Sequence, residues 1–207
     1  MKIAVFVSGG GTNLQAIIDN IKSGYLADVE IVLVLASNNG AYALTRASDN
    51  GIPSCVVSVK DYADKDDWDQ AVLDKVKESG AELIVLAGYL SLLGTKTVRE
   101  YSNRIINIHP ALIPSFCGAG MYGIRPHKAV LARGVKVSGA TVHFVNENYD
   151  EGPIILQKAV DVRPDDTPES LQQRIMKECE QVILPRAIRL IADGKVTIEN
   201  NIAIVNS

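Results

Sequence analysis

The sequence predicts an α/β protein with a mostly parallel, twisted sheet that has helices on both faces, and an antiparallel hairpin in the C-terminal half. Two observations lead to this prediction. In the first half of the chain, short apolar runs rich in β-branched residues alternate with segments whose apolar residues recur at helical spacing, the pattern of βαβ units. After Gly134, two strand-like segments follow each other with no helix between them, which favours antiparallel pairing.

The first half begins with a buried strand and an amphipathic helix. Lys2 to Val7 is an apolar run that ends at glycines, as expected of a strand covered on both faces. Asn13 to Ile21 follows with apolar residues three and four positions apart, which predicts a helix. The same two patterns predict, in order, a strand at Ile31 to Ala36, a helix at Ala41 to Ala47, a brief strand near Val56, a helix around Trp68 to Val76, and strands at Leu83 to Ala87 and Arg104 to Ile108.

The second half has a different pattern. Lys136 to Val145 and Pro153 to Val162 flank a polar loop, residues 146–152, and most simply form a hairpin. A long helix is predicted from Thr167 to about Ala192, and Pro185 is expected to kink or interrupt it.

A small hairpin is predicted at the end of the sequence, where Val196 to Glu199 and Ile202 to Val205 flank two asparagines. No internal repeat, low-complexity tract or linker interrupts the pattern. Residues 1–207 are therefore expected to form a single domain.

Composition argues against several classes of partner. The 207 residues include 21 basic and 24 acidic side chains, for a net charge of −3, and 47% are hydrophobic. The basic residues are scattered among acids, so no clustered basic face for nucleic acid is expected. No apolar run approaches the roughly 20 residues that a membrane span requires. The N-terminal apolar run is too short, and too soon broken by glycines, for a signal peptide.

The cysteines indicate the compartment. Cys55, Cys117 and Cys179 lie far apart and form no CxxC pair. An odd, dispersed set argues for a reducing environment and against both a disulfide framework and a zinc site. The cytoplasm is the expected location, and no metal is expected.

A glycine-rich stretch, Ser8-Gly9-Gly10-Gly11-Thr12-Asn13, lies between the first strand and the first helix. Glycines let the backbone turn tightly and approach a ligand, and the N–H groups at a helix start favour an anion. The stretch matches neither the Walker A loop nor GxGxxG. Two interpretations stay open, a phosphate site or only a tight turn. A phosphate bound here would be a monophosphate, since no lysine in the stretch supports a polyphosphate.

Two polar side chains end the last strand of the first half, in the segment INIHPALIP. Asn107 and His109 lie two apart, so in an extended strand they point the same way, and Pro110 keeps His109 out of the helical region. Open α/β sheets bind ligands at the carboxyl ends of their strands. Asp150, in the hairpin loop, is the natural carboxylate partner. The set contains no nucleophile, so it suits a reaction in which one substrate attacks another while the protein stabilises an oxyanion and relays protons. A capped strand end is the alternative.

Other polar residues receive structural interpretations from the sequence alone. His127 is expected at a helix start, and Cys117 as a passive thiol in a loop. His143, inside a strand, is interpreted as a satisfied structural histidine, with a supporting role beside the site as the alternative. Lys177 and Glu180, three apart on the long helix, are interpreted as a solvated pair.

Four segments together resemble one known family. They are SGGGTNLQAI near the N-terminus, LAGYLSLL at Leu86 to Leu93, INIHPALIPSF, and SGATVHFVNENYDEGPIILQ. They are similar to phosphoribosylglycinamide formyltransferase of the folate-dependent type, and the similarity runs essentially end to end. The resemblance implies a Rossmann-like formyltransferase fold. It also implies transfer of a formyl group from 10-formyltetrahydrofolate to the amine of the glycinamide ribotide, in purine biosynthesis.

The resemblance also implies which residues act. Asn107, His109 and Asp150 fall on the family's catalytic positions. The phosphate and ribotide are implied at Gly11, Thr12, Asn13, Lys177 and Glu180, and the folate at Lys65, Leu90, Ser91, Leu92, Leu93, Asn146, Glu147, Asn148 and Tyr149. The N-terminal half is thus expected to bind the ribotide, and the C-terminal half to bind folate and catalyse. The implied partners are small molecules, handled by a monomer or homodimer without metal, nucleic acid or membrane.

One segment departs from the family. Residues 117–127 are longer than the short loop of many relatives, so contacts made by that loop elsewhere do not carry over. Ser91 stands where some relatives have arginine. The bond between Ile113 and Pro114 is expected to be cis, because the chain must reverse sharply after His109 and the resemblance implies the same.

Rival activities share INIHP-like motifs. Methionyl-tRNA formyltransferase usually has an added basic domain and formyltetrahydrofolate hydrolase an N-terminal regulatory domain, and neither domain is expected in these 207 residues. The glycine-rich stretch with Asn13 also fits a small phosphorylated acceptor better. A non-catalytic mononucleotide or folate sensor is the remaining alternative, and the presence of Asn107, His109 and Asp150 together argues against it.

Overall fold

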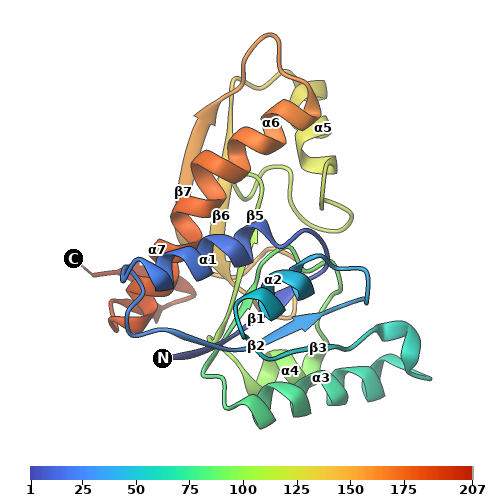
Figure 1. Cartoon of the computed structure of the whole chain (residues 1–207). Coiled ribbons are helices and arrows are strands. Elements are labelled where there is room, and N and C mark those ends of the chain that lie inside the picture. The colour runs from blue at the N-terminus through green and yellow to red at the C-terminus, as the bar shows by residue number, and fades with distance from the viewer. Residues whose placement is uncertain (207) are drawn as a thin grey trace. The chain divides into compact units, whose positions relative to one another are not determined.

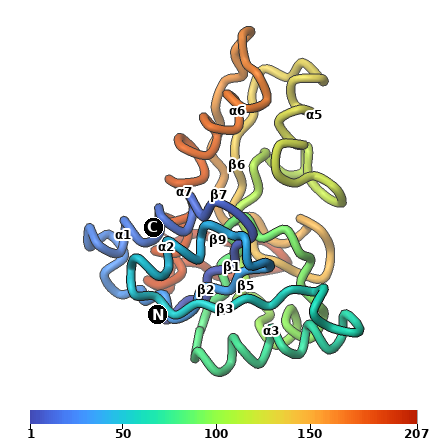
Figure 2. The backbone as a smooth tube through the Cα atoms, turned by 45° about the vertical axis from the view of Figure 1, so that its right-hand side comes forward, coloured from blue at the N-terminus to red at the C-terminus, as the bar shows by residue number. Residues whose placement is uncertain are grey.

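The computed structural model describes residues 1–206, whose path is drawn as a cartoon (Figure 1) and as a tube (Figure 2). The chain forms two compact units, Met1–Ile106 and the residues from Asn107 onward. The division falls inside one strand, at the point where the sequence changes from apolar to polar.

The first unit alternates strands and helices, as predicted. Its elements are β1 (Lys2–Val7), α1 (Thr12–Lys22), β2 (Glu30–Ala36), α2 (Ala43–Asp49), β3 (Ser54–Val56), a 3₁₀ turn (Val59–Asp61), α3 (Lys65–Ser79), β4 (Leu83–Leu86), α4 (Thr95–Glu100) and β5 (Ile105–His109). Figure 1 shows α1 and α2 on one face of these strands and α3 and α4 on the other. Because both faces are covered, the strands are continuously apolar, and Phe6, Leu35 and Ile84 have no exposed surface.

Strand order places the glycine-rich stretch at a switch point. β1 pairs in parallel with β2 and β4, and β2 pairs in parallel with β3. The order β3-β2-β1-β4-β5 therefore reverses direction between β1 and β4. The carboxyl ends of the two strands at such a reversal form the usual ligand site of open α/β sheets, and the glycine-rich stretch follows β1 directly.

The second unit contains the predicted hairpin. Its elements are α5 (Arg125–Arg133), β6 (Val137–Phe144), β7 (Ile154–Asp161), α6 (Pro168–Ile175), a π-helical turn (Met176–Glu180), α7 (Gln181–Ala192), β8 (Val196–Glu199) and β9 (Ile202–Val205). β6 and β7 pair antiparallel and complete a seven-stranded sheet of order β3-β2-β1-β4-β5-β6-β7. In Figure 2, α6 runs beside β6, with which it is in contact. The predicted fold class is confirmed.

The terminal hairpin is also confirmed. β8 and β9 form a separate antiparallel pair. Asn200 and Asn201 connect them with φ of 49° and 62°. Asparagine tolerates this left-handed region better than most residues, which explains the two adjacent asparagines at the turn.

The long C-terminal helix differs from its prediction in where it is interrupted. Helix α7 continues through Pro185, and the interruption is the π-helical turn Met176–Glu180, which ends just before α7 begins. Proline cannot donate a bond to the carbonyl four residues earlier, which for Pro185 is Gln181, the first residue of α7. The lost bond therefore lies at the start of α7, where it leaves the rest of the helix intact.

Candidate active site

Asn107 and His143 meet across neighbouring strands. Nδ1 of His143 lies 2.7 Å from the carbonyl oxygen of Phe144, which can only accept, so this nitrogen bears the hydrogen. In the neutral ring Nε2 is then an acceptor, and it lies 3.2 Å from Nδ2 of Asn107, which donates to it. The amide of Asn107 is thus oriented with its NH₂ group toward His143. One of the two amide hydrogens is used in this bond and the other remains for a ligand.

His109 ends β5 and is 4% exposed. Its Nε2 lies 3.0 Å from the carbonyl oxygen of Phe116, so Nε2–H donates there, and Nδ1 faces Asp150 Oδ2 at 3.7 Å. Burial lowers the pKa of His109, although the Asp150 charge and the Phe116 carbonyl oppose this shift. The ring is therefore neutral near pH 7. Asp150 faces His109, as expected, but the hydrogen bond of His109 goes to Phe116, which the sequence did not indicate.

Asp150 gathers contacts from three directions. Its Oδ2 accepts the Gly118 N–H at 2.8 Å, and its Oδ1 lies 3.5 Å from His143 Nε2. Burial favours a raised pKa for this carboxyl. The pKa of Asp150 is nevertheless lowered below its usual value, because contact with His143, the Gly118 N–H and the nearby His109 together outweigh burial. The side chain is therefore a carboxylate at neutral pH. Its backbone φ of 54° is left-handed, which aspartate tolerates.

His143 belongs to this cluster, which favours the alternative interpretation of a supporting role beside the site. It touches both Asn107 and Asp150 while its other nitrogen is fixed by Phe144. The one sequence signal was its position in β6 on the face opposite its neighbours Val142 and Phe144. Only the pairing of distant segments reveals the contacts.

A buried hydroxyl holds the turn after His109. Thr141 Oγ1 has no exposed surface, donates to the Ala111 carbonyl at 2.7 Å and accepts the Ile113 N–H at 3.1 Å. Gln157 Nε2 adds bonds to Thr141 Oγ1 at 3.0 Å and to the Ile113 carbonyl at 2.9 Å. The Ile113–Pro114 bond is cis, as predicted.

His127 is more deeply buried than a helix-start residue would be. It lies in the first turn of α5 with 0% exposure, and neither ring nitrogen has a partner among the described residues. Burial first, and the nearby His109 second, lower its pKa to about 4. His127 is therefore a neutral ring at any pH near 7.

The glycine-rich stretch opens α1 within the first unit. Gly11 is the N-cap, with φ of 69°, and no side chain caps the helix start. The first helical bond runs from the Gln15 N–H to the Gly11 carbonyl at 2.9 Å, so the preceding N–H groups lie outside the helix's own ladder. Backbone N–H groups at a helix start of this kind favour an anion.

The remaining implied positions lie on several elements. Lys65 is the first residue of α3, and the π-helical turn includes both Lys177 and Glu180. Glu180 is 8% exposed, so the interpretation of a solvated pair is wrong for it. In the implied folate segments, the large exposed side chains are Leu90, Leu92 and Tyr149, while Leu93 is buried.

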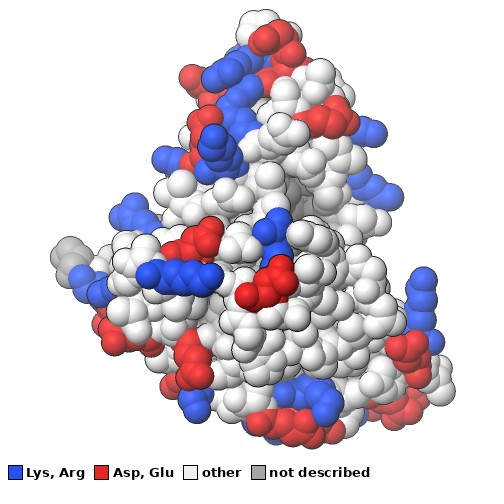
Figure 3. All heavy atoms as spheres, viewed as in Figure 1, with Lys and Arg blue, Asp and Glu red and all other residues white. Residues whose placement is uncertain are grey.

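Basic and acidic side chains are interspersed on the face drawn in Figure 3. No helix among residues 1–206 is long and apolar enough to span a bilayer. Nor does that described part of the chain group three His, Cys, Asp or Glu side chains as ligands for a metal ion.

Comparison with known proteins identifies relatives along the whole chain. The family model described as formyl transferase matches residues 1–188. The chain is 37% identical over 202 residues to phosphoribosylglycinamide formyltransferase of Haemophilus influenzae, covering 98% of this chain and 92% of that protein. It is 43% identical to the trifunctional purine biosynthetic protein adenosine-3 of Gallus gallus, covering 96% of this chain but only 19% of that much longer protein.

Solved structures agree with these relatives. Glycinamide ribonucleotide transformylase 1 from Symbiobacterium toebii superposes with a TM-score of 0.94 at 39% identity, covering 100% of this chain and 94% of that one. A formyltetrahydrofolate deformylase from Pseudomonas syringae pv. tomato superposes with a TM-score of 0.89 at 30% identity, covering 100% of this chain and 66% of that one. The resemblance noted in the sequence is confirmed, and the chain belongs to the formyl transferase family.

Proposed function

We propose that this protein transfers a formyl group from 10-formyltetrahydrofolate to the amine of 5-phosphoribosylglycinamide, as a step of purine biosynthesis. The observation that supports this most directly is the cluster of Asn107, His109, His143 and Asp150, which offers hydrogen-bond donors and a carboxylate but no nucleophile of its own. Such a set fits direct attack of one substrate on another. Purified protein should form formylated ribotide and tetrahydrofolate in equal amounts, and failure to do so would reject the proposal.

The reaction forms a bond between the amine nitrogen and the formyl carbon, breaks the bond from that carbon to the folate nitrogen, and moves one proton from the first nitrogen to the second. An oxyanion develops on the formyl oxygen. The second Nδ2 hydrogen of Asn107 donates to it, since His143 already holds the first. Nε2–H of His109 donates as well, with the oxyanion replacing the Phe116 carbonyl as its acceptor. The Asp150 carboxylate assists the proton transfer.

Each unit has its own part in this proposal. In the first unit, the phosphate binds at Gly11, Thr12 and Asn13, and the folate contacts Lys65 and Leu90 to Leu93. In the unit from Asn107 onward, residues 146–149 contact the folate, Lys177 and Glu180 contact the ribotide, and the catalytic cluster acts. The protein works on small molecules in the cytoplasm as a monomer or homodimer, without metal, nucleic acid or membrane. The three free thiols accord with a reducing compartment.

Adding a β-carbon at Gly11 tests the phosphate assignment. In Gly11→Ala the new carbon would lie 2.7 Å from Ala43 Cβ and 2.9 Å from Ala43 Cα, at a φ of +69°, so the loop must move. Losing a charge-assisted bond to phosphate should raise the KM for the ribotide about 10- to 100-fold, with little change in the KM for the folate. Gly24→Ala is the matched control, because Gly24 has a φ of +82° but open space around it. Equal effects on both substrates would place the phosphate elsewhere.

Removing the charge of Asp150 tests its part in proton transfer. Asp150→Asn retains an oxygen that can accept the Gly118 N–H, so the loop and folate binding should survive. The turnover rate should fall about 100-fold or more, the usual size of a general acid–base contribution. Glu151→Gln removes the same charge from the next, exposed residue and should retain the wild-type rate. A rate–pH profile unchanged by Asp150→Asn would contradict the assignment.

Hydrolysis of the folate is the second candidate, and it is supported by the superposition on a formyltetrahydrofolate deformylase. In that reaction water would take the place of the amine. This chain is 30% identical to that deformylase and 39% identical to the Symbiobacterium transformylase, which favours transfer. Formate released at the same rate with and without the ribotide would establish hydrolysis instead.

A further inference from the structure

Helix α2 holds the glycine-rich stretch from one side. The Ala43 N–H donates to the Gly9 carbonyl at 3.1 Å, and Nε of Arg46 donates to the Gly10 carbonyl at 2.8 Å. Gly11 packs so closely on Ala43 that no β-carbon fits there. Three consecutive glycines thus contact the same helix.

These contacts set the direction of the neighbouring N–H groups. In a trans peptide the carbonyl and the following N–H point in opposite directions, and the one cis bond among residues 1–206 is Ile113–Pro114. Because the carbonyls of Gly9 and Gly10 face α2, the N–H groups of Gly10 and Gly11 point away from it. Successive N–H groups aimed to one side form an anion-binding concavity.

Arg46 also brings a positive charge to this stretch. Its Nη1 donates to Gln15 Oε1 at 3.0 Å, and its guanidinium lies over the Tyr42 ring, 5.2 Å from the centroid. Gln15 donates in turn to Asp19, which fixes the amide with its oxygen toward Arg46. All these acceptors of Arg46 are neutral, and within residues 1–206 it forms no ion pair with a carboxylate.

We propose that Arg46 is a positioning residue for a phosphate monoester bound at the glycine-rich stretch. It aims the N–H groups of Gly10 and Gly11 at the anion and adds one positive charge behind them, without touching the substrate itself. This role explains how a stretch without lysine can hold a dianion. The proposal rests on the phosphate site of the proposed function and adds Gly10 to its donors.

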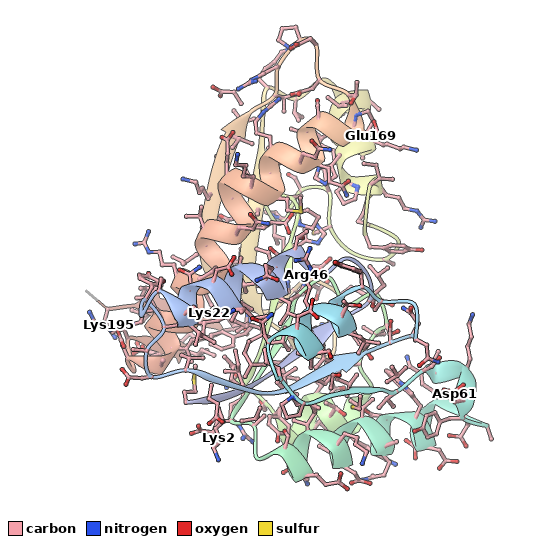
Figure 4. All side chains as sticks on the ribbon, in the orientation of Figure 1. Lys2, Lys22, Arg46, Asp61, Glu169 and Lys195 are labelled. Atoms are coloured by element: carbon pink, nitrogen blue, oxygen red, sulfur yellow. The ribbon has the colours of Figure 1, made fainter. Side chains whose placement is uncertain are left out.

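Lys22 supplies a matched control. Its ammonium binds the Asn50 side chain, so it also joins α1 to the end of α2, as Arg46 does. It lies in the last turn of α1, whereas Arg46 contacts the first turn, and Figure 4 shows the two side chains at opposite ends of that helix. Arg46→Met and Lys22→Met each remove one positive charge and keep an unbranched side chain.

The experiment measures binding of inorganic phosphate to the whole chain by calorimetry at low ionic strength. Arg46→Met should weaken the affinity about 10-fold or more, since it loses both a charge-assisted bond and the charge, while Lys22→Met should change it less than about twofold. Arg46→Lys, which keeps the charge but not the forked donor, should recover part of the loss. In formyl transfer, the KM for the ribotide should rise in Arg46→Met while kcat and the KM for the folate stay within about twofold.

Several results would overturn the inference. One is equal phosphate affinity in Arg46→Met and Lys22→Met, and another is a wild-type protein that does not bind phosphate. A third is a rise of both KM values in Arg46→Met together with a lower Tm, which would indicate a general structural role. Phosphate binding that depends on Arg46, in a protein without formyl transfer, would support the inference and reject the proposed function alone.

Discussion

Replacing His109 with alanine is expected to lower kcat by about 100- to 1,000-fold while both substrates still bind, because a donor to the oxyanion is lost. The ring donates Nε2–H in the structure and is neutral near pH 7, so it can supply a hydrogen bond without first being protonated. Steady-state kinetics with both substrates would measure kcat, and calorimetry would measure each affinity. A variant with near wild-type kcat would remove His109 from the mechanism.

Asn107→Ala provides the companion measurement, with a loss of similar size. It differs in one respect, because it also leaves Nε2 of His143 without its donor. Asn107→Asp keeps the shape of the side chain but has no N–H, so it should be at least as slow as the alanine variant. Recovery of rate in Asn107→Asp would show that shape, and not hydrogen-bond donation, is what matters at this position.

The second large effect is on stability, and it comes from His127. The unfolded chain has an ordinary histidine pKa near 6.5, whereas burial in the folded protein lowers it to about 4. A lowered pKa means that the folded state favours the neutral ring. The part of the free energy of unfolding that depends on a neutral His127 is therefore complete above pH 6.5 and is lost as the pH falls from 6.5 to 4. Over that window the free energy of unfolding should fall by on the order of 3 kcal/mol on account of His127.

Urea unfolding between pH 4 and pH 8 would measure this, with His127→Leu as the comparison, because leucine has a similar size and cannot take up a proton. Carboxylates that titrate on acidification affect both proteins alike, so the difference between the two curves isolates His127. The pKa of His109 is lowered in the same direction, so His109→Ala measures how much of the pH dependence comes from that second histidine. Parallel curves for the wild type and His127→Leu would contradict the prediction.

The strands could be predicted because a strand that is buried on both faces is a continuous apolar run in the sequence. β1, β2 and β4 read as continuous apolar runs, and each lies within about a residue of its predicted bounds. Helix α4 was not predicted, because its stabilising contacts lie elsewhere in the chain. Asp69 accepts the Lys96 N–H at 2.8 Å and the Thr97 hydroxyl at 2.6 Å, so the start of α4 is capped from α3, 27 residues away.

The site, like the fold, could be predicted only where the signal lies in a short stretch of sequence. Asn107 and His109 could be paired from their spacing alone, and Asp150 was a plausible partner from the loop. Their assignment as the catalytic set came from the family resemblance and stays a prediction. The partners that orient them, His143 and the Phe116 carbonyl, depend on strand pairing and on the path of residues 110–118. No local pattern encodes such contacts.

The Phe144 carbonyl that fixes the hydrogen of His143 also restricts what can follow Asp150 in the chain. Gly152 lies so close to this oxygen that a β-carbon there would overlap it. The N–H of Phe144 donates to the Pro153 carbonyl at 2.9 Å, so strand pairing leaves the Phe144 oxygen little freedom to move. Any side chain at position 152 would therefore displace the acceptor of His143 and with it the amide of Asn107. In the proposed mechanism, a substitution at Gly152 would therefore lower turnover by displacing the Asn107 amide, by way of Phe144 and His143.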